Sequence, residues 1–186
     1  MFNIDDIRSL LIQEVRNHNI KDCGYDCMNG RKYVEIRNVV FECNKGYIFS
    51  DIKKIPKIDK SWYEENYTPI LYKDDQLVKC WNTLVDNPNS RQAVIVMTST
   101  DNLQCTMYMH VSLLPIGNDT YELEYSVHMR SNDAIEFRTD YNWHMKVYEY
   151  LFARLSTYYN VVKKNIIWCV DSLQLYEQYF DNAVKS

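Results

Sequence analysis

Glycine and proline are scarce in this sequence, with four of each among 186 residues. Collagen-like and low-complexity chains are rich in one or both, so these classes are excluded, and a hydrophobic share of 46% argues against disorder. Long apolar runs are also lacking, and the N-terminal segment MFNIDDIRSL has neither the basic nor the apolar region of a signal peptide. We therefore expect a cytoplasmic protein with no membrane contact.

The sequence also lacks an excess of positive charge. It has 21 Lys and Arg residues and 25 Asp and Glu residues, which gives a net charge of -4. A general nucleic-acid-binding protein carries a basic face, so we expect no direct binding of nucleic acid, although a local pocket for one phosphate is compatible with this balance. The 16 tyrosines and the Asn- and Lys-rich texture suggest an AT-rich genome, such as that of a phage or other virus. In that case the expected location is the cytoplasm of the host cell.

Zinc-like cysteine spacing is missing. The six cysteines are scattered along the chain, and in a reducing compartment we expect free thiols. Cys23 and Cys27 form a C-x3-C pair, but no second Cys or His pair follows at the spacing that zinc sites use. The sequence therefore predicts no metal site.

Apolar periodicity predicts one α+β domain over residues 1–186, with a mixed or antiparallel sheet covered by two or three helices. Helical spacing indicates helices over residues 3–18 (capped by Asn3 or Asp5), 74–85 and 140–158. Alternating or continuously apolar runs indicate strands over residues 32–43, 91–99, 104–115, 121–131 and 165–170. We expect a hairpin turn at 117–119, an irregular connection with short helical pieces at 44–73, and a short helix or turn at 171–182.

Four local blocks combine polar side chains with strand-like segments: NPNSRQAVI (87–95), NLQCTMYMH (102–110), HMRSND (128–133) and WCVDSLQLY (168–176). In this order they resemble the thymidylate synthase and pyrimidine-nucleotide hydroxymethylase family. There an S-R pair precedes a strand, a cysteine opens the next strand, R-S-x-D ends another, and an aspartate-led segment ends in tyrosine. The resemblance implies a thymidylate synthase-like fold and a transferase acting on a pyrimidine nucleoside monophosphate, with 5,10-methylenetetrahydrofolate as one-carbon donor.

The chemistry implied by the family needs a thiolate that adds to carbon 6 of the pyrimidine, so that carbon 5 becomes nucleophilic. Cys105 matches the family nucleophile; the alternative is a small apolar filler in a strand. Arg130 and Ser131 match the phosphate-binding pair, and a guanidinium suits both a phosphate and a nearby thiolate. The alternative for Arg130 is a structural salt bridge.

Arg91 matches the S-R arginine that reaches the phosphate from the other subunit, so the resemblance implies a homodimer. A solvated arginine at a strand start is the alternative, and Gln92 replaces the second arginine of the family. Asp133 matches the aspartate that contacts the folate pterin. It is also suited to cap local N–H groups at a strand end.

Counting on from Asp133, the family's base-reading residue falls near Asp140, and a one-residue slip brings in Asn142. A carboxylate accepts from the amino group of cytosine, so Asp140 favours cytidylate. Asp140 is equally suited to be a helix N-cap. Tyr176 matches the tyrosine that bonds the sugar hydroxyl, with Gln174 in place of a family histidine; the alternative for Tyr176 is a packed aromatic.

Three departures from the family leave a second hypothesis open. Residues 44–73 are too short for the family region that carries a catalytic glutamate, although Glu64 or Glu65 beside Trp62 are stand-ins. The chain lacks the family's C-terminal extension, and Leu103-Gln104 replaces a pair of prolines. The second hypothesis is a catalytically inactive nucleotide-binding protein or a partner subunit in a heteromer with an active protein; a third is a purely structural role.

Overall fold

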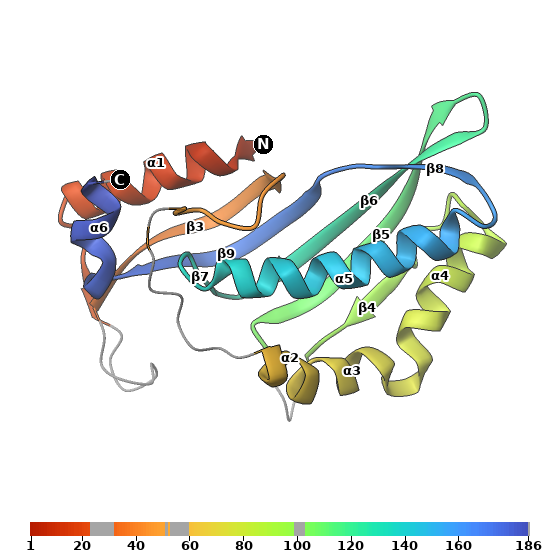
Figure 1. The fold of residues 1–186 in the computed structure, drawn as a ribbon, viewed down its shortest axis with the longest axis horizontal. Coiled ribbons are helices and arrows are strands. Elements are labelled where there is room, and N and C mark those ends of the chain that lie inside the picture. Colours follow the sequence, from red (N-terminus) through yellow and green to blue (C-terminus); the bar gives the residue numbers. More distant parts are fainter. Residues whose placement is uncertain (23–31, 51, 53–59, 99–102, 186) are drawn as a thin grey trace.

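A single mixed β-sheet extends along the molecule, and the long helix α5 (Phe137–Leu155) crosses one of its faces (Figure 1). The computed structural model describes residues 1–22, 32–50, 52, 60–98 and 103–185. The expected α+β class and mixed sheet are confirmed, and one buried core joins the sheet to the helices. The finer likeness to the thymidylate synthase fold stays a prediction.

The strands are β1 (Phe2–Asn3), β2 (Lys21–Asp22), β3 (Lys32–Cys43), β4 (Val94–Val96), β5 (Thr106–Gly117), β6 (Thr120–Met129), β7 (Asn132–Asp133), β8 (Asn160–Lys163) and β9 (Ile166–Tyr176). The other helices are α1 (Ile4–Arg16), α2 (Lys60–Asn66), α3 (Thr68–Tyr72), α4 (Gln76–Asp86) and α6 (Phe180–Lys185), with 3-10 turns η2 (Lys73–Asp75) and η3 (Glu177–Tyr179). The sheet order is β1-β3-β9-β6-β5-β4, with β2 beside β3, β7 beside β9 and β8 beside β6. The C-terminal strand β9 therefore lies in the middle of the sheet.

Helix α1 begins where the sequence supplies a capping box. The side chain of Asn3 accepts from the N–H groups of Asp5 and Asp6 at 2.9 Å each, and the Asp6 carboxylate accepts from the Asn3 N–H at 2.9 Å. Of the two caps that the sequence allowed, Asn3 is confirmed. The buried face of α1 is made by Ile4, Ile7 and Leu11.

The predicted hairpin joins β5 to β6. Gly117 and Thr120 are paired, and the two residues between them, Asn118 and Asp119, have φ angles of 51° and 53°. Asn and Asp tolerate this left-handed conformation, which two-residue hairpin loops require. The turn brings the beginning of β5 beside the end of β6, which joins the second and third polar blocks of the sequence.

The segment after residue 170 differs from the prediction. Residues 171–176, expected as part of a helix or turn, are the second half of β9 and pair with β3 from Tyr33↔Tyr176 to Arg37↔Ser172. The polar residues alternate with Leu173 and Leu175, which are fully buried. The strand tolerates its polar side chains because they are hydrogen-bonded to each other. Helix is confirmed only after Tyr176, in η3 and α6.

The core-facing positions of β3 change parity in mid-strand. Val34 and Ile36 are buried before the change, and Val39 and Phe41 are buried after it. Asn38 lies between them with a φ of 51°, a conformation that Asn adopts more readily than most residues. Odd-numbered residues therefore face the core after Asn38, but before it the odd-numbered Glu35 lies on the side opposite the core residues Val34 and Ile36.

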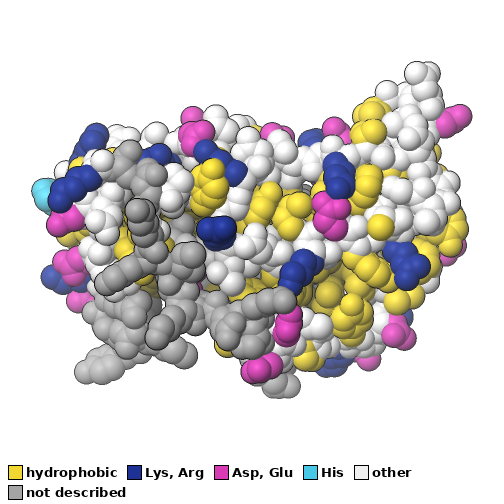
Figure 2. Space-filling view, viewed as in Figure 1, with side chains coloured by type: hydrophobic (Ala, Val, Ile, Leu, Met, Phe, Trp, Pro, Cys, Tyr) yellow, Lys and Arg dark blue, Asp and Glu magenta, His cyan; other side chains and the backbone are white. Residues whose placement is uncertain are grey.

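No helix in the described part of the chain is long and apolar enough to span a membrane. Figure 2 shows the face crossed by α5, where Lys and Arg side chains are interspersed with Asp and Glu over the described surface. This mixed distribution agrees with the low net charge of the sequence.

Candidate functional site

Cys105 lies immediately before β5, half-buried, and the β5–β6 hairpin brings it beside the end of β6. Its carbonyl oxygen accepts a hydrogen bond from the N–H of Arg130 at 2.9 Å. The hydroxyl of Ser131 donates to its Sγ, with 3.5 Å between oxygen and sulfur. Residues of two polar blocks, 102–110 and 128–133, are therefore in direct contact.

The Arg130 side chain is exposed and lies along the segment that precedes Cys105. Its Nε donates to the carbonyl of Gln104 at 3.3 Å, and one Nη donates to the carbonyl of Leu103 at 3.4 Å. These carbonyls are neutral, so they fix the guanidinium without cancelling its charge. A guanidinium has five N–H donors, and two of them are used in these bonds to described residues. A positive charge thus lies along the two residues that precede Cys105, and it is suited to an anion.

Thr106, the residue after Cys105, is fully buried and bonded on two sides. Its Oγ1 lies 3.2 Å from Nε2 of His144, and its N–H donates to the Tyr67 hydroxyl oxygen at 3.3 Å. The other ring nitrogen of His144 lies 3.0 Å from the Tyr125 hydroxyl. Burial lowers the pKa of His144 to about 3, so the imidazole is neutral at neutral pH and donates through one nitrogen while accepting through the other. This buried chain anchors the backbone beside Cys105.

Asp140 is buried in the first turn of α5, beneath the same region. Tyr63 of α2 donates to one carboxylate oxygen, and Nδ2 of Asn132 donates to the other at 2.6 Å. Burial raises the pKa of Asp140 to about 6, even though the two hydrogen bonds act to lower it. Burial, together with the charge of Asp140, also raises the pKa of Tyr63, so this phenol stays protonated and remains a donor.

The sequence allowed Asp140 as the N-cap of its helix, and that interpretation is wrong. Helix α5 begins at Phe137, with Glu136 as its N-cap residue, because Phe137 packs into the core against Phe41. Asn142, the other candidate for reading a base, is exposed. Two residues along an α-helix correspond to a rotation of about 200°, so Asn142 points away from the buried Asp140 cluster.

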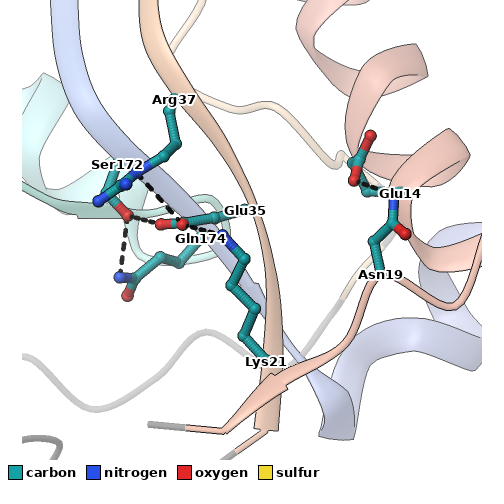
Figure 3. A network of polar contacts seen from close by, with 7 residues as sticks. All are labelled: Glu14, Asn19, Lys21, Glu35, Arg37, Ser172 and Gln174. Atoms are coloured by element: carbon teal, nitrogen blue, oxygen red, sulfur yellow. Dashed lines mark hydrogen bonds and ion pairs between the residues drawn. The ribbon is translucent and has the colours of Figure 1, made fainter.

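Gln174 and Tyr176 lie on β9 and belong to one hydrogen-bonded chain. The Tyr176 hydroxyl donates to Oε1 of Gln174 at 2.9 Å, and Nε2 of Gln174 donates to Oγ of Ser172 at 3.1 Å. The Ser172 hydroxyl in turn donates to the carboxylate of Glu35 on β3 (Figure 3). The Tyr176 ring also lies against Tyr33, with 6.1 Å between ring centroids. The two candidate sugar-binding side chains are therefore held together, and the packed-aromatic alternative is compatible with the same arrangement.

Glu35 is the anionic end of this chain, with a side chain that is only 5% exposed. Lys21 donates to the same carboxylate, and Nε of Arg37 lies 3.3 Å from it (Figure 3). Burial opposes ionisation of Glu35, but the hydrogen bonds from Lys21 and Ser172 and the charge of Arg37 outweigh it and lower the pKa of Glu35. Glu35 is therefore a carboxylate at neutral pH, and a hydrogen-bond acceptor only.

Asp133 lies in the same cross-strand row. It is paired with Gln174 across β7 and β9, and Gln174 is paired with Glu35 across β9 and β3. Side chains of directly paired residues emerge on one face of a sheet, so these three carboxyl and amide groups share a face. Oδ1 of Asp133 accepts from the N–H of Ile135 at 2.8 Å, which is the local capping contact that the sequence gave as an alternative.

Arg91 is not brought to this cluster within one chain. It is exposed and precedes β4, whose far end pairs through Val96 with Tyr108, three residues from Cys105. At about 3.3 Å per residue of extended chain, Arg91 lies more than a dozen ångströms back along the strand. A contact between Arg91 and the Cys105 region therefore requires a second copy of the chain.

Sequence reasoning missed the buried partners of the site. Glu64 and Glu65, named as stand-ins for a catalytic glutamate, are exposed. Tyr63, the residue before them on α2, is buried and donates a hydrogen bond to Asp140. A weak signal was present, because Tyr63 and Tyr67 stand four residues apart and so share a helical face. His144 gave no signal of its own beyond its position in the predicted helix.

Among the described residues, no group of three or more His, Cys, Asp and Glu side chains is placed to hold a metal ion. Cys23 and Cys27, the one pair with a suggestive spacing, lie outside the described residues. Neither a scan against protein-family models nor a search of curated proteins returned a match for this chain. The family resemblance drawn from the four sequence blocks accordingly stays a prediction.

Proposed function

We propose that this protein transfers a one-carbon unit, methyl or hydroxymethyl, to carbon 5 of a pyrimidine nucleoside monophosphate. The observation that carries the proposal is the contact of Cys105 with Arg130 and Ser131. It brings a hydroxyl into contact with a thiol, and the guanidinium of Arg130 is bonded to the two residues that precede the thiol. The thiol suits covalent attack on the base, and the guanidinium suits binding of a phosphate dianion. The hydroxyl can donate a hydrogen bond to an anionic sulfur or phosphate oxygen.

In the reaction we propose, the thiolate of Cys105 adds to carbon 6, and the ring electrons move toward carbon 5 and onto the oxygen at carbon 4 of uracil or onto nitrogen 3 of cytosine. The hydroxyl of Ser131 donates to the sulfur, and the guanidinium of Arg130 is bonded to the carbonyls of Leu103 and Gln104, just before Cys105. Carbon 5 then attacks the one-carbon electrophile, which is at the oxidation level of formaldehyde, and loses its proton to solvent as the carrier leaves. Water would supply the oxygen of a hydroxymethyl product, whereas a methyl product would need a hydride from the reduced carrier. Expulsion of the Cys105 thiolate restores the double bond between carbons 5 and 6.

Base selection is assigned to Asp140. Each carboxylate oxygen has two lone pairs, so the oxygens that accept from Tyr63 and Asn132 can each accept once more. An amino group of cytosine is the matching donor. Calorimetric titration with deoxycytidylate and deoxyuridylate should favour deoxycytidylate, and Asp140→Asn should shift the preference toward deoxyuridylate. An unchanged ranking would remove Asp140 from this role.

The described residues fit a folate less well than they fit a nucleotide. Asp133 is the residue that the resemblance assigns to the pterin, and its Oδ1 already accepts from the Ile135 N–H. One carboxylate does not make up a folate site, so we derive no step through folate. In the proposal, 5,10-methylenetetrahydrofolate is named only as the source of the one-carbon unit.

The test is release of tritium from deoxyuridylate or deoxycytidylate labelled at carbon 5, with and without methylenetetrahydrofolate. Adduct formation makes the carbon 5 hydrogen exchangeable, so the wild-type protein should release tritium and Cys105→Ala should not. Cys169→Ala is the matched control, because Cys169 is also a half-buried free thiol but lies on β9. Release that is equal in wild type and Cys105→Ala would contradict the proposal.

A second function is a nucleotide-binding protein without catalysis, or a subunit that pairs with an active protein. The incomplete folate set favours it, since several residues match the family's phosphate- and sugar-binding groups, while Asp133 alone of the residues named here matches the pterin side. Tight binding of a nucleoside monophosphate without tritium release at any folate concentration would select this function.

The proposal includes a homodimer in which Arg91 reaches the phosphate of the other subunit. Arg91 is remote from Cys105 in its own chain, and the sheet face turned away from α5 carries partly exposed apolar residues. Val94, Val96 and Val40 on this face are 38%, 47% and 40% exposed. Val94 and Val96 are on β4 and Val40 is on β3, with three strands between them, and partly exposed apolar side chains across a sheet face favour association.

Sedimentation velocity tests the assembly. A dimer at micromolar concentration is expected, and Val96→Lys should dissociate it while Val162→Lys, also 40% exposed but on the short strand β8, should not. A wild-type monomer would contradict the assignment of Arg91. A cytoplasmic location and the lack of nucleic-acid contact complete the proposal.

A further inference from the structure

Strand β4 forms one edge of the sheet, and within the described part of the chain it pairs with β5 alone. Figure 1 shows β4 at this edge, and α4 contacts it. The Ala93 carbonyl and the Met97 N–H are both bonded to residues of β5. Backbone groups of successive residues in an antiparallel strand point alternately to its two sides. Those of Val94 and Val96 therefore point away from β5, toward the open edge.

One side chain of α4 occupies the open edge at Val96. Oε1 of Gln76 accepts from the Val96 N–H at 2.9 Å, and Nε2 of Gln76 donates to the Val96 carbonyl at 3.2 Å. Nε2 also donates to the Ile70 carbonyl of α3 at 3.0 Å. In an antiparallel sheet, a residue of a neighbouring strand makes the same two bonds to the residue opposite it. The Gln76 amide therefore takes the place of one residue of a further strand.

An unusual turn directly before α4 directs Gln76 at this edge. Asp74 and Asp75 have φ angles of 53° and 56°, a left-handed conformation that non-glycine residues adopt singly rather than in succession. Such backbone costs free energy and persists where surrounding contacts fix it. Gln76 provides these contacts, because its amide ties the start of α4 to α3 on one side and to β4 on the other.

The sequence of the edge suits pairing with a second copy of the chain. Residues 92–98, QAVIVMT, contain no charge and no proline, and four of the seven are β-branched. Identical segments of this composition pair with one another when they are open at a sheet edge, and proteins protect such edges with charge, proline or a covering group. Two copies of β4 that run antiparallel place the apolar residues of one copy opposite those of the other. Neither charge nor proline protects this edge, so the protection comes from Gln76.

We propose that the edge of β4 is a strand-pairing surface for a second copy of this chain, and that Gln76 keeps it closed. When the amide is withdrawn, the N–H and carbonyl of Val96 become available, and the β4 strands of two copies pair antiparallel across a two-fold axis. This contact differs from the homodimer of the proposed function, which uses the face of the sheet rather than its edge. It also needs no nucleotide, so it stands or falls independently of the proposed reaction.

Sedimentation velocity over a range of micromolar concentrations tests the proposal with a matched pair of variants. Gln76→Ala removes the amide, and it should associate beyond the wild-type assembly with an association constant raised by about tenfold or more, since two strand-to-strand hydrogen bonds become possible. Gln76→Lys loses the same bonds but places a charge at the edge, which opposes strand pairing, so it should sediment like the wild type. Gln92→Ala, at an exposed glutamine just before β4, should also match the wild type.

Two results would overturn the proposal. One is a folded Gln76→Ala protein that sediments like the wild type at every concentration. The other is equal association of Gln76→Ala and Gln76→Lys, because association would then follow from loss of a contact within the fold rather than from an open edge.

Hydrogen exchange of the Val96 amide reports on the edge itself. In dilute Gln76→Ala this amide should exchange at least tenfold faster than in the wild type, and its protection should return at concentrations where copies associate. An exchange rate that is the same in dilute Gln76→Ala and in wild type would overturn the proposal. Should Gln76→Ala fail to fold, Gln76→Asn replaces it, because an amide one methylene shorter does not reach Val96. That variant should show the same association and the same faster exchange, and wild-type behaviour in both measurements would overturn the proposal.

Discussion

Asp140 and His144 lie one turn apart on the same buried face of α5. Each is hydrogen-bonded to a residue that directly follows Ser131 or Cys105 in the chain. Asp140 accepts from Asn132, which follows Ser131, and His144 is bonded to Thr106, which follows Cys105. One rigid helix therefore sets the relative position of the ends of two strands. A site on such a support is held more closely than one on loops.

The two helix residues should oppose each other in the pH dependence of stability. The pKa of Asp140 is raised to about 6 in the folded protein from about 4, so folding binds a proton and stability grows as pH falls through 6. The pKa of His144 is lowered to about 3 from about 6.5, so stability is lost as pH falls below 6.5. From about pH 6 down to 4, the two contributions act in opposite directions.

Asp140→Asn removes the contribution that grows in acid and leaves that of His144. We expect the free energy of unfolding of this variant to fall by about 1.4 kcal/mol per pH unit more steeply than that of the wild type between pH 6 and 4. Urea unfolding at pH 7, 6, 5 and 4 measures the slope. The control is Asp119→Asn at the exposed hairpin turn, whose slope should match the wild type. Parallel curves for Asp140→Asn and wild type would show that Asp140 titrates normally.

Tyr63→Phe deletes a single hydroxyl that donates to a buried carboxylate. Because Asp140 then keeps only the Asn132 bond, we expect a loss of about 1–3 kcal/mol in the free energy of unfolding at pH 7. The loss should shrink at pH 5, where Asp140 is largely protonated. Tyr72→Phe provides the comparison, since Tyr72 is 57% exposed and its change should be within error of zero.

Thr106→Val keeps the shape of a buried side chain and removes its hydroxyl. Nε2 of His144 is then left without its partner, so we expect a destabilisation of about 1–3 kcal/mol by chemical unfolding. The exposed Thr157→Val should cost less than 1 kcal/mol. The same variant should loosen the backbone at Cys105, visible as faster hydrogen exchange of the Thr106 amide; unchanged exchange and stability would show that the bond to His144 contributes nothing.

Much of the fold follows from local patterns, while the buried partners of the site do not. The alternation over 32–43 and the turn at 117–119 predicted β3 and the hairpin, because each is encoded by residues close in the chain. The bond between Tyr63 and Asp140 joins residues 77 positions apart and depends on how α2 meets α5. No local pattern encodes that contact.

The second half of β9 is a further element whose structure depends on a contact distant in the sequence. Ser172, Gln174 and Tyr176 belong to a segment that the sequence predicts as a short helix or turn, because a lone strand cannot satisfy such side chains. Glu35, more than 130 residues earlier, makes them compatible with the middle of a sheet. The parity change at Asn38 is equally hidden, since one residue with a positive φ decides which side of β3 is polar.

The most direct test of the account asks whether a nucleotide covers Cys105. The measurement is the rate at which iodoacetamide alkylates each cysteine, followed by peptide mass spectrometry with and without saturating deoxyuridylate or deoxycytidylate. We predict that nucleotide slows alkylation of Cys105 at least tenfold and leaves Cys169 unaffected, and that Arg130→Ala or removal of the phosphate from the ligand abolishes the protection. Equal alkylation of Cys105 with and without either nucleotide would contradict the central claim that this thiol and this guanidinium share one binding site.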